Sequence, residues 1–169
     1  MEEVQTEVET ILQGIQMEPV LVGIVMGSES DREVMEAACK ELDDRKIKYE
    51  LNVLSAHRDP DKVAHYARTA QSRGIKVLIG GAGKAAALPG VLAAYSNVPV
   101  IGVPIKTSDL GGLDSLLSIV QMPPGVPVAC VAINGARNAA ILAAKILDIL
   151  AVPHELMRRW TGVLGGGRA

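Results

Sequence analysis

The chain has 169 residues and a mass of 17.8 kDa, which suits one domain of about 150 residues with a short appendage. Hydrophobic residues make up 49% and charged residues 21%, a balance that excludes disorder, collagen-like repeats and coiled coil. The 17 basic and 19 acidic residues leave no general basic surface, and aromatic residues reach only 2%. We therefore expect no nucleic-acid partner.

The amino-terminal residues and the cysteines both predict a cytoplasmic protein. The opening MEEVQTEVE is acidic where a secretory signal carries a basic region. No uninterrupted apolar run approaches the roughly 18 residues of a membrane-spanning helix, so we expect no membrane partner. Cys39 and Cys130 lie in apolar patterns without a C-x-x-C motif, which predicts buried, reduced thiols.

Hydrophobic periodicity predicts the elements in chain order. Apolar residues at helical spacing predict an amphipathic helix at the start of the chain, which we interpret as an appendage. Short apolar runs rich in β-branched residues predict strands at 19–26, 49–54, 76–79, 98–103 and 126–133. Helical patterns lie at 32–44, 60–73 and 137–150.

This alternation of strands and helices predicts an α/β fold. We expect a three-layer αβα arrangement, in which a doubly wound parallel sheet is covered by helices on both faces. The predicted organisation is an N-terminal helical appendage at 1–17, the α/β domain at 18–152, and a C-terminal helix with a frayed tail at 153–169. Ligands of such sheets bind at the carboxyl ends of the strands, so the chemistry is expected in the loops that follow them.

The loop after the first strand has the composition of an anion site. Residues 26–31, MGSESD, place small residues and two hydroxyls before a helix N-terminus, where backbone N–H groups and the helix dipole favour a phosphate. The alternative is that Ser30 and Asp31 only cap the following helix, since Ser30 and Glu33 have capping-box spacing. The loop does not match a Walker or Rossmann fingerprint.

The loop after the second strand carries a histidine beside an arginine. His57 and Arg58 precede Asp59-Pro60, a helix start with Asp as the N-cap. An arginine can bind phosphate through two hydrogen bonds, and histidine, whose ordinary pKa is about 6.5, exchanges protons near neutrality. The alternative is that the histidine is structural.

Small residues dominate the loop after the third strand. Residues 80–90, GGAGKAAALPG, allow the backbone to approach either a flat ligand or a second chain, and the spacing does not separate the two uses. Further loops are predicted at 106–112 and 121–125. No H-E-x-x-H motif, Cys/His set or carboxylate cluster predicts a metal, and no G-x-S-x-G motif predicts a hydrolase.

Taken together, these loops resemble the N5-carboxyaminoimidazole ribonucleotide mutase family of purine biosynthesis. The matching segments run in the family's order over roughly residues 20–150: MGSESD at 26–31, SAHRDPDK at 55–62, GGAGKAAALPG at 80–90, PVIGVPI at 99–105, GLDSLLSIVQMPPGVPVA at 112–129 and NAAILAAKIL at 138–147. The resemblance implies a flavodoxin-like fold, a small ribonucleotide substrate, a homo-octamer, and neither a metal nor an organic cofactor.

The resemblance also implies the site. His57 matches the family's catalytic proton carrier, and the substrate-binding positions fall into two groups. The predicted contacts to ribose and phosphate are Ser28, Asp31 and Arg58, and the predicted wall around the imidazole consists of Ser55, Ala56, Ala82, Gly83 and Leu88. The implied reaction moves a carboxyl group from the exocyclic nitrogen N5 to ring carbon C4 through decarboxylation and recarboxylation.

Two residues depart from the family pattern. Ala87 stands where the family usually has a second active-site histidine, and Lys84 stands at a position that is commonly small or apolar. The lost imidazole is expected to weaken carboxylate or CO₂ binding, and an inward-turned Lys84 is one way to compensate. Two alternatives to the mutase stay open: a divergent paralogue that carboxylates or decarboxylates another nucleotide, and a nucleotide-binding module without turnover.

Overall fold

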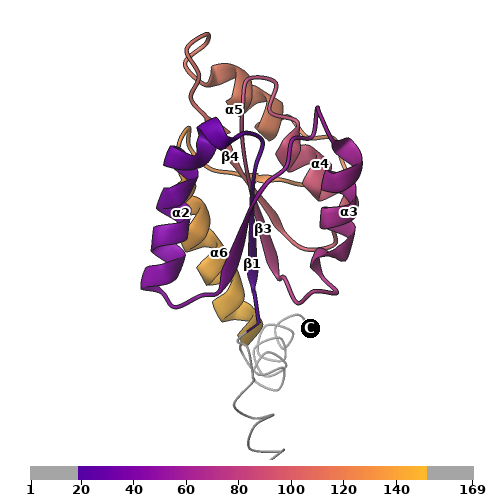
Figure 1. Cartoon of the computed structure of the whole chain (residues 1–169), viewed down its shortest axis with the longest axis vertical. Coiled ribbons are helices and arrows are strands. Elements are labelled where there is room, and N and C mark those ends of the chain that lie inside the picture. Colours follow the sequence, from indigo (N-terminus) through magenta and orange to yellow (C-terminus); the bar gives the residue numbers. More distant parts are fainter. Residues whose placement is uncertain (1–18, 152–169) are drawn as a thin grey trace, which may run out of the picture.

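The computed structural model describes residues 19–151 and contains a five-stranded parallel sheet (Figure 1). The predicted appendage at 1–17 and the predicted C-terminal helix and tail at 153–169 lie outside the described residues. The strand order is β2-β1-β3-β4-β5, with bounds β1 Val22–Met26, β2 Tyr49–Val53, β3 Val77–Gly83, β4 Val100–Ile105 and β5 Ala129–Cys130. This order confirms the predicted α/β fold class with a doubly wound sheet.

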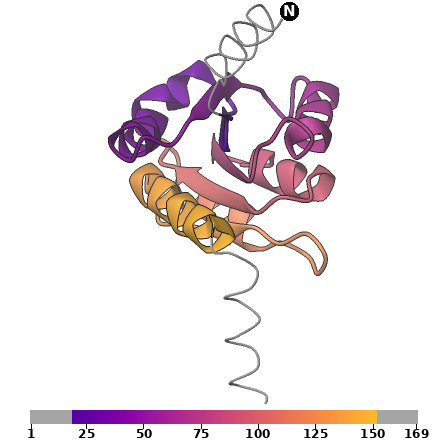
Figure 2. The same ribbon diagram turned by 90° about the horizontal axis from the view of Figure 1, so that it is seen from below.

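Helices cover both faces of the sheet. They are the short 3₁₀ helix η1 Glu29–Asp31 and the α-helices α2 Arg32–Asp44, α3 Pro60–Ala70, α4 Leu88–Tyr95, α5 Leu113–Val120 and α6 Ala136–Ala151. Figure 2 shows α2 and α6 side by side on one face and α3 and α4 on the other. No helix among residues 19–151 is long and apolar enough to cross a bilayer.

Each face of the sheet buries its own hydrophobic core. All residues of β1 and β4 are buried, as expected of central parallel strands covered on both sides. On the first face, α6 presents the buried alanines Ala139, Ala140 and Ala143, which allow it to pack closely against α2 and the sheet. On the second face, Val63 and Leu92 bring α3 and α4 against the sheet.

Several element predictions need correction. Helices α4 and α5 were not predicted, and the 80–90 segment expected as a loop contains the end of β3 and the start of α4. The strand expected at 126–133 is reduced to two paired residues beside β4, because Pro127 has no N–H to donate to a ladder. Strand β3 continues beyond the expected end to pair Ala82 and Gly83 with β4.

Helix starts agree with the sequence in one case and differ in another. Asp59 caps α3, as its Oδ1 accepts a hydrogen bond from Lys62 N at 3.3 Å. The capping box expected from Ser30 is wrong, because the serine that caps is Ser28, whose Oγ accepts from Ser30 N at 3.3 Å at the start of η1. The side chain of Ser30 is therefore directed toward the loop rather than to the helix.

Candidate active site

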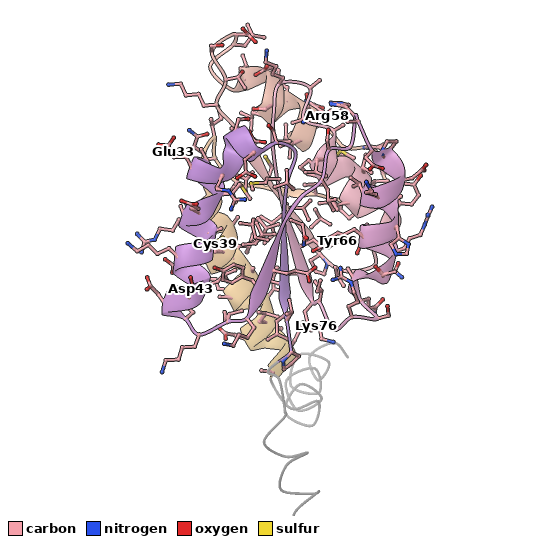
Figure 3. The ribbon with its side chains drawn as sticks, in the orientation of Figure 1. Glu33, Cys39, Asp43, Arg58, Tyr66 and Lys76 are labelled. Carbon is pink, nitrogen blue, oxygen red and sulfur yellow. The ribbon has the colours of Figure 1, made fainter. Side chains whose placement is uncertain are left out.

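The loops after four strands meet around one cavity of about 470 Å³. Figure 3 shows Arg58 at the end of the molecule opposite Lys76, that is, at the carboxyl edge of the sheet. Every residue predicted for the site lines this cavity: His57, Ser28, Asp31, Ser55, Ala56, Arg58, Ala82, Gly83 and Leu88. Residues that are far apart in the sequence are thus brought together by the parallel topology.

The loop after β1 forms a compact cluster of hydroxyl and carboxyl groups. Ser30 Oγ donates to Ser28 Oγ at 2.9 Å and lies 3.5 Å from Asp31 Oδ1. Burial raises the pKa of the Asp31 carboxyl, and hydrogen bonds from the Ser28 backbone and the Ser30 side chain partly oppose that rise. Gly27 N donates to Gly81 O at 3.1 Å, which holds this loop against β3.

The loop after β2 folds Arg58 toward the loop after β1. Arg58 N donates to Ser55 Oγ at 3.3 Å, and one guanidinium nitrogen donates to Gly27 O at 3.3 Å. His57 and Arg58 are both exposed at the mouth of the cavity. A charged fork, two serine hydroxyls and a histidine therefore share one side of the cavity, which suits an anionic ligand and a proton transfer.

The loop after β3 builds the opposite wall almost without polar side chains. A Cβ added at Gly83 would lie 2.8 Å from Thr107 Cγ2, so only glycine lets the two loops approach this closely. Ala87 precedes α4 and caps it without a side-chain hydrogen bond, while Leu88 is buried. The small side chains of this wall let a flat ligand ring lie directly against the backbone.

Lys84 is the exception in that wall. Its backbone is left-handed, with φ of +54°, and its Nζ lies 2.8 Å from Asp109 Oδ2. The hydrogen bond with Asp109 raises the pKa of the Lys84 ammonium and, reciprocally, lowers the pKa of the Asp109 carboxyl. The inward-turned Lys84 considered from the sequence is therefore not the arrangement found, because the ammonium pairs with Asp109.

The loop after β4 was predicted at 106–112 without a role in the site, and it contributes Thr107 to the cavity. Thr107 Oγ1 is buried without a hydrogen-bond partner. Lys106 N donates to Asn134 Oδ1 at 2.8 Å, and Ser115 Oγ is shared between Ile105 O and Gly112 O at 2.8 Å each. Thr107 lies in the loop predicted at 106–112, beyond the carboxyl end of a predicted strand, and that place was the signal that could have identified it.

Sequence reasoning missed further residues of the cavity. Gly27, Ser30, Ala85 and Ala86 also line it, each from a loop that the sequence had already marked as functional. Among residues 19–151, no group of three or more His, Cys, Asp or Glu side chains is placed to hold a metal ion. The polar or charged side chains that line the cavity are those of Ser28, Ser30, Asp31, Ser55, His57, Arg58, Lys84 and Thr107.

Comparisons with known proteins agree with this geometry. Residues 21–159 match the model of the AIR carboxylase family. The N5-carboxyaminoimidazole ribonucleotide mutase of Pyrococcus abyssi is 64% identical over 128 residues, covering 76% of this chain and 74% of that protein. The mutase of Bacillus subtilis is 57% identical over 145 residues, covering 85% of this chain and 88% of that protein.

A second kind of enzyme and a solved structure are also similar to this chain. The phosphoribosylaminoimidazole carboxylase of Schizosaccharomyces pombe is 60% identical over 131 residues, which are 78% of this chain but 24% of that protein. A crystal structure of Treponema denticola PurE superposes with a TM-score of 0.69 at 28% identity, covering 86% of this chain and 89% of that one. The flavodoxin-like fold and the family resemblance are thus confirmed, and the chain belongs to the AIR carboxylase family.

Proposed function

We propose that this protein is an N5-carboxyaminoimidazole ribonucleotide mutase of purine biosynthesis, an isomerase that moves a carboxyl group from N5 to C4. The relatives named as such mutases, at 57–64% identity, support this activity. The observation that carries the proposal is that His57, Arg58 and Ser28 line one cavity. A proton carrier, a phosphate-binding fork and a hydroxyl cluster thereby act on a single ligand.

The reaction needs one group that first gives and then takes a proton. The N5–carboxyl bond breaks, CO₂ departs, and the electron pair left on N5 takes a proton from His57. The electron-rich C4 then attacks CO₂, a new carbon–carbon bond forms, and the C4 proton returns to His57. A histidine suits both transfers because its ordinary pKa lies near the working pH.

The other cavity residues hold the ribonucleotide during these steps. Ser28, Asp31 and Arg58 bind its ribose and phosphate, and the wall around the imidazole is formed by Ser55, Ala56, Ala82, Gly83 and Leu88. Holding CO₂ beside C4 turns a bimolecular recapture into an effectively unimolecular step, a gain of about 7–11 kcal/mol in well-oriented systems. Ala56, Ala82 and Gly83 bring no nucleophilic side chain to this part of the wall.

Two other functions remain as alternatives. A divergent paralogue that carboxylates or decarboxylates another nucleotide is favoured by Ala87, because the residue brings no imidazole to the cavity. A nucleotide-binding module without turnover is the second alternative, and His57 at the cavity argues against it.

Incubation of the purified protein with N5-carboxyaminoimidazole ribonucleotide, followed by the absorbance of the C4-carboxylated product, separates these functions. The mutase forms the product. Tight ribonucleotide binding without turnover would favour the binding module. We expect Ala87→His to raise mutase turnover; no gain, together with turnover of a different nucleotide, would favour the paralogue.

We further propose a homo-octamer in the cytoplasm. Support for assembly comes from Leu113, Leu117 and Val120, which are each about half exposed and recur along α5 at helical spacing. The free thiols of Cys39 and Cys130 support a reducing compartment. Light scattering is expected to give eight times the chain mass, and a monomer mass would contradict the assembly.

A further inference from the structure

Lys84 occupies a position that disfavours it on structural grounds. Its left-handed backbone, with φ of +54°, is strained for any residue with a side chain and relaxed for glycine, which is abundant in the same loop. Its ion pair with Asp109 is exposed, at 68% for Lys84 and 58% for Asp109, so water screens the attraction. Stability therefore does not account for a lysine at this position.

Lys84 lines the cavity from the side opposite Arg58, and its ammonium pairs with Asp109. Among the residues that the structure describes, Arg58 and Lys84 are the two Lys or Arg side chains that line this cavity. Arg58 follows β2 and Lys84 follows β3, and β1 lies between these strands in the sheet. The cavity thus has one cation on each side of the Ser28 cluster.

The proposed substrate also carries two anionic groups, a phosphate and a carboxylate. Arg58 lies next to the hydroxyl cluster after β1, since its guanidinium donates to Gly27 O, and this is the phosphate side. The second cation is then left for the carboxylate. Lysine suits a carboxylate that changes its position during the reaction, because its ammonium is a point charge on a flexible stem.

We propose that Lys84 is a substrate-binding residue that recognises the carboxylate, with Asp109 as its exchangeable partner. Asp109 holds the ammonium at the rim of the cavity, and the ammonium moves to the carboxylate when a carboxylated ribonucleotide binds. Because both side chains are well exposed, the exchange replaces one screened ion pair by another at little cost. This inference rests on the proposed function, since that function supplies the carboxylate.

Two ribonucleotides that differ by one carboxylate test the inference. Calorimetry compares aminoimidazole ribonucleotide with its C4-carboxylated form on the wild-type protein and on Lys84→Met. We expect Lys84→Met to weaken binding of the carboxylated form about tenfold, the scale of one charge-assisted hydrogen bond at an exposed site, and to leave the uncarboxylated form within about twofold. Asp109→Asn is expected to tighten the carboxylated form about threefold, because it releases the ammonium and removes a repelling charge.

Further variants separate recognition from structure. Lys84→Arg is expected to keep the preference for the carboxylated form. Lys84→Gly is expected to raise the melting temperature, by relieving the left-handed strain, while it loses the preference. Lys106→Met is the matched control, because Lys106 is exposed in the same loop as Asp109 and does not line the cavity.

Two results would overturn the inference: equal weakening of both ribonucleotides by Lys84→Met, which would assign Lys84 to the phosphate or to the cavity wall, and no change for either. Failure of the wild-type protein to bind either ribonucleotide would count against the proposed function itself and is seen before any variant is compared.

Discussion

Ser115 is the buried side chain that fixes the start of α5 to the end of β4. Its hydroxyl is fully buried and is shared between Ile105 O and Gly112 O, at 2.8 Å each. Ser115→Ala deletes the donor and leaves at least one buried carbonyl without it, which costs about 1–3 kcal/mol of the free energy of unfolding. For a domain of this size the melting temperature is expected to fall by about 2–12 °C.

Ser118 provides a matched control in the same helix. Its hydroxyl also donates to a backbone carbonyl, Asp114 O, at 2.8 Å, but the residue is exposed, so water replaces the lost bond. Ser118→Ala is expected to change the free energy of unfolding by less than about 0.5 kcal/mol. Urea unfolding of both variants at one protein concentration is the assay. Equal losses for the two serines would refute the argument that burial sets the cost.

The remaining predictions concern packing, pH and substrate affinity. Gly102→Ala is expected to lower the free energy of unfolding in urea by about 1–3 kcal/mol. The added Cβ would collide with Ile119 and lie 3.0 Å from Val128 Cγ1. Gly27→Ala is the control and is expected to be nearly neutral, because the atom nearest to its Cβ would be 3.9 Å away. Glu41 accepts hydrogen bonds from Arg137 and Arg45, which hold its carboxyl pKa below the ordinary 4.5. This contribution to stability is present above that pH and is lost as the pH falls through the lowered pKa, so thermal melts of Glu41→Gln should differ from wild type at pH 7 and converge in acid. Arg58→Gln is expected to raise KM for the ribonucleotide about tenfold with a smaller change in kcat, since a phosphate contact is made equally in ground and transition states.

The sheet was predictable from the sequence because its strands are buried on both faces. Continuous apolar runs such as residues 100–105 contain no alternation and end in loop residues, which is typical of parallel strands. Helix α4 was missed because LPGVLAAY is apolar around most of its circumference and shows no amphipathic period. Helix α5 was missed although its apolar residues recur at helical spacing, because it is only eight residues long and lies between two predicted loops.

The candidate site was predictable to the extent that it depends on strand ends. His57 and Arg58 follow one apolar run and Ser28 follows another, and the parallel topology brings those ends together. The contact between Lys84 and Asp109 was not predictable from the sequence. It depends on the left-handed backbone of Lys84 and on how the loops after β3 and β4 lie relative to each other.

The most direct test of the account is the turnover of N5-carboxyaminoimidazole ribonucleotide by the wild-type protein and by His57→Asn, with ribonucleotide binding measured on both. The account predicts product formation by the wild type, and for the variant a rate at least about 10²-fold lower with binding retained, since only proton transfer is removed. An unchanged rate in His57→Asn would contradict the account.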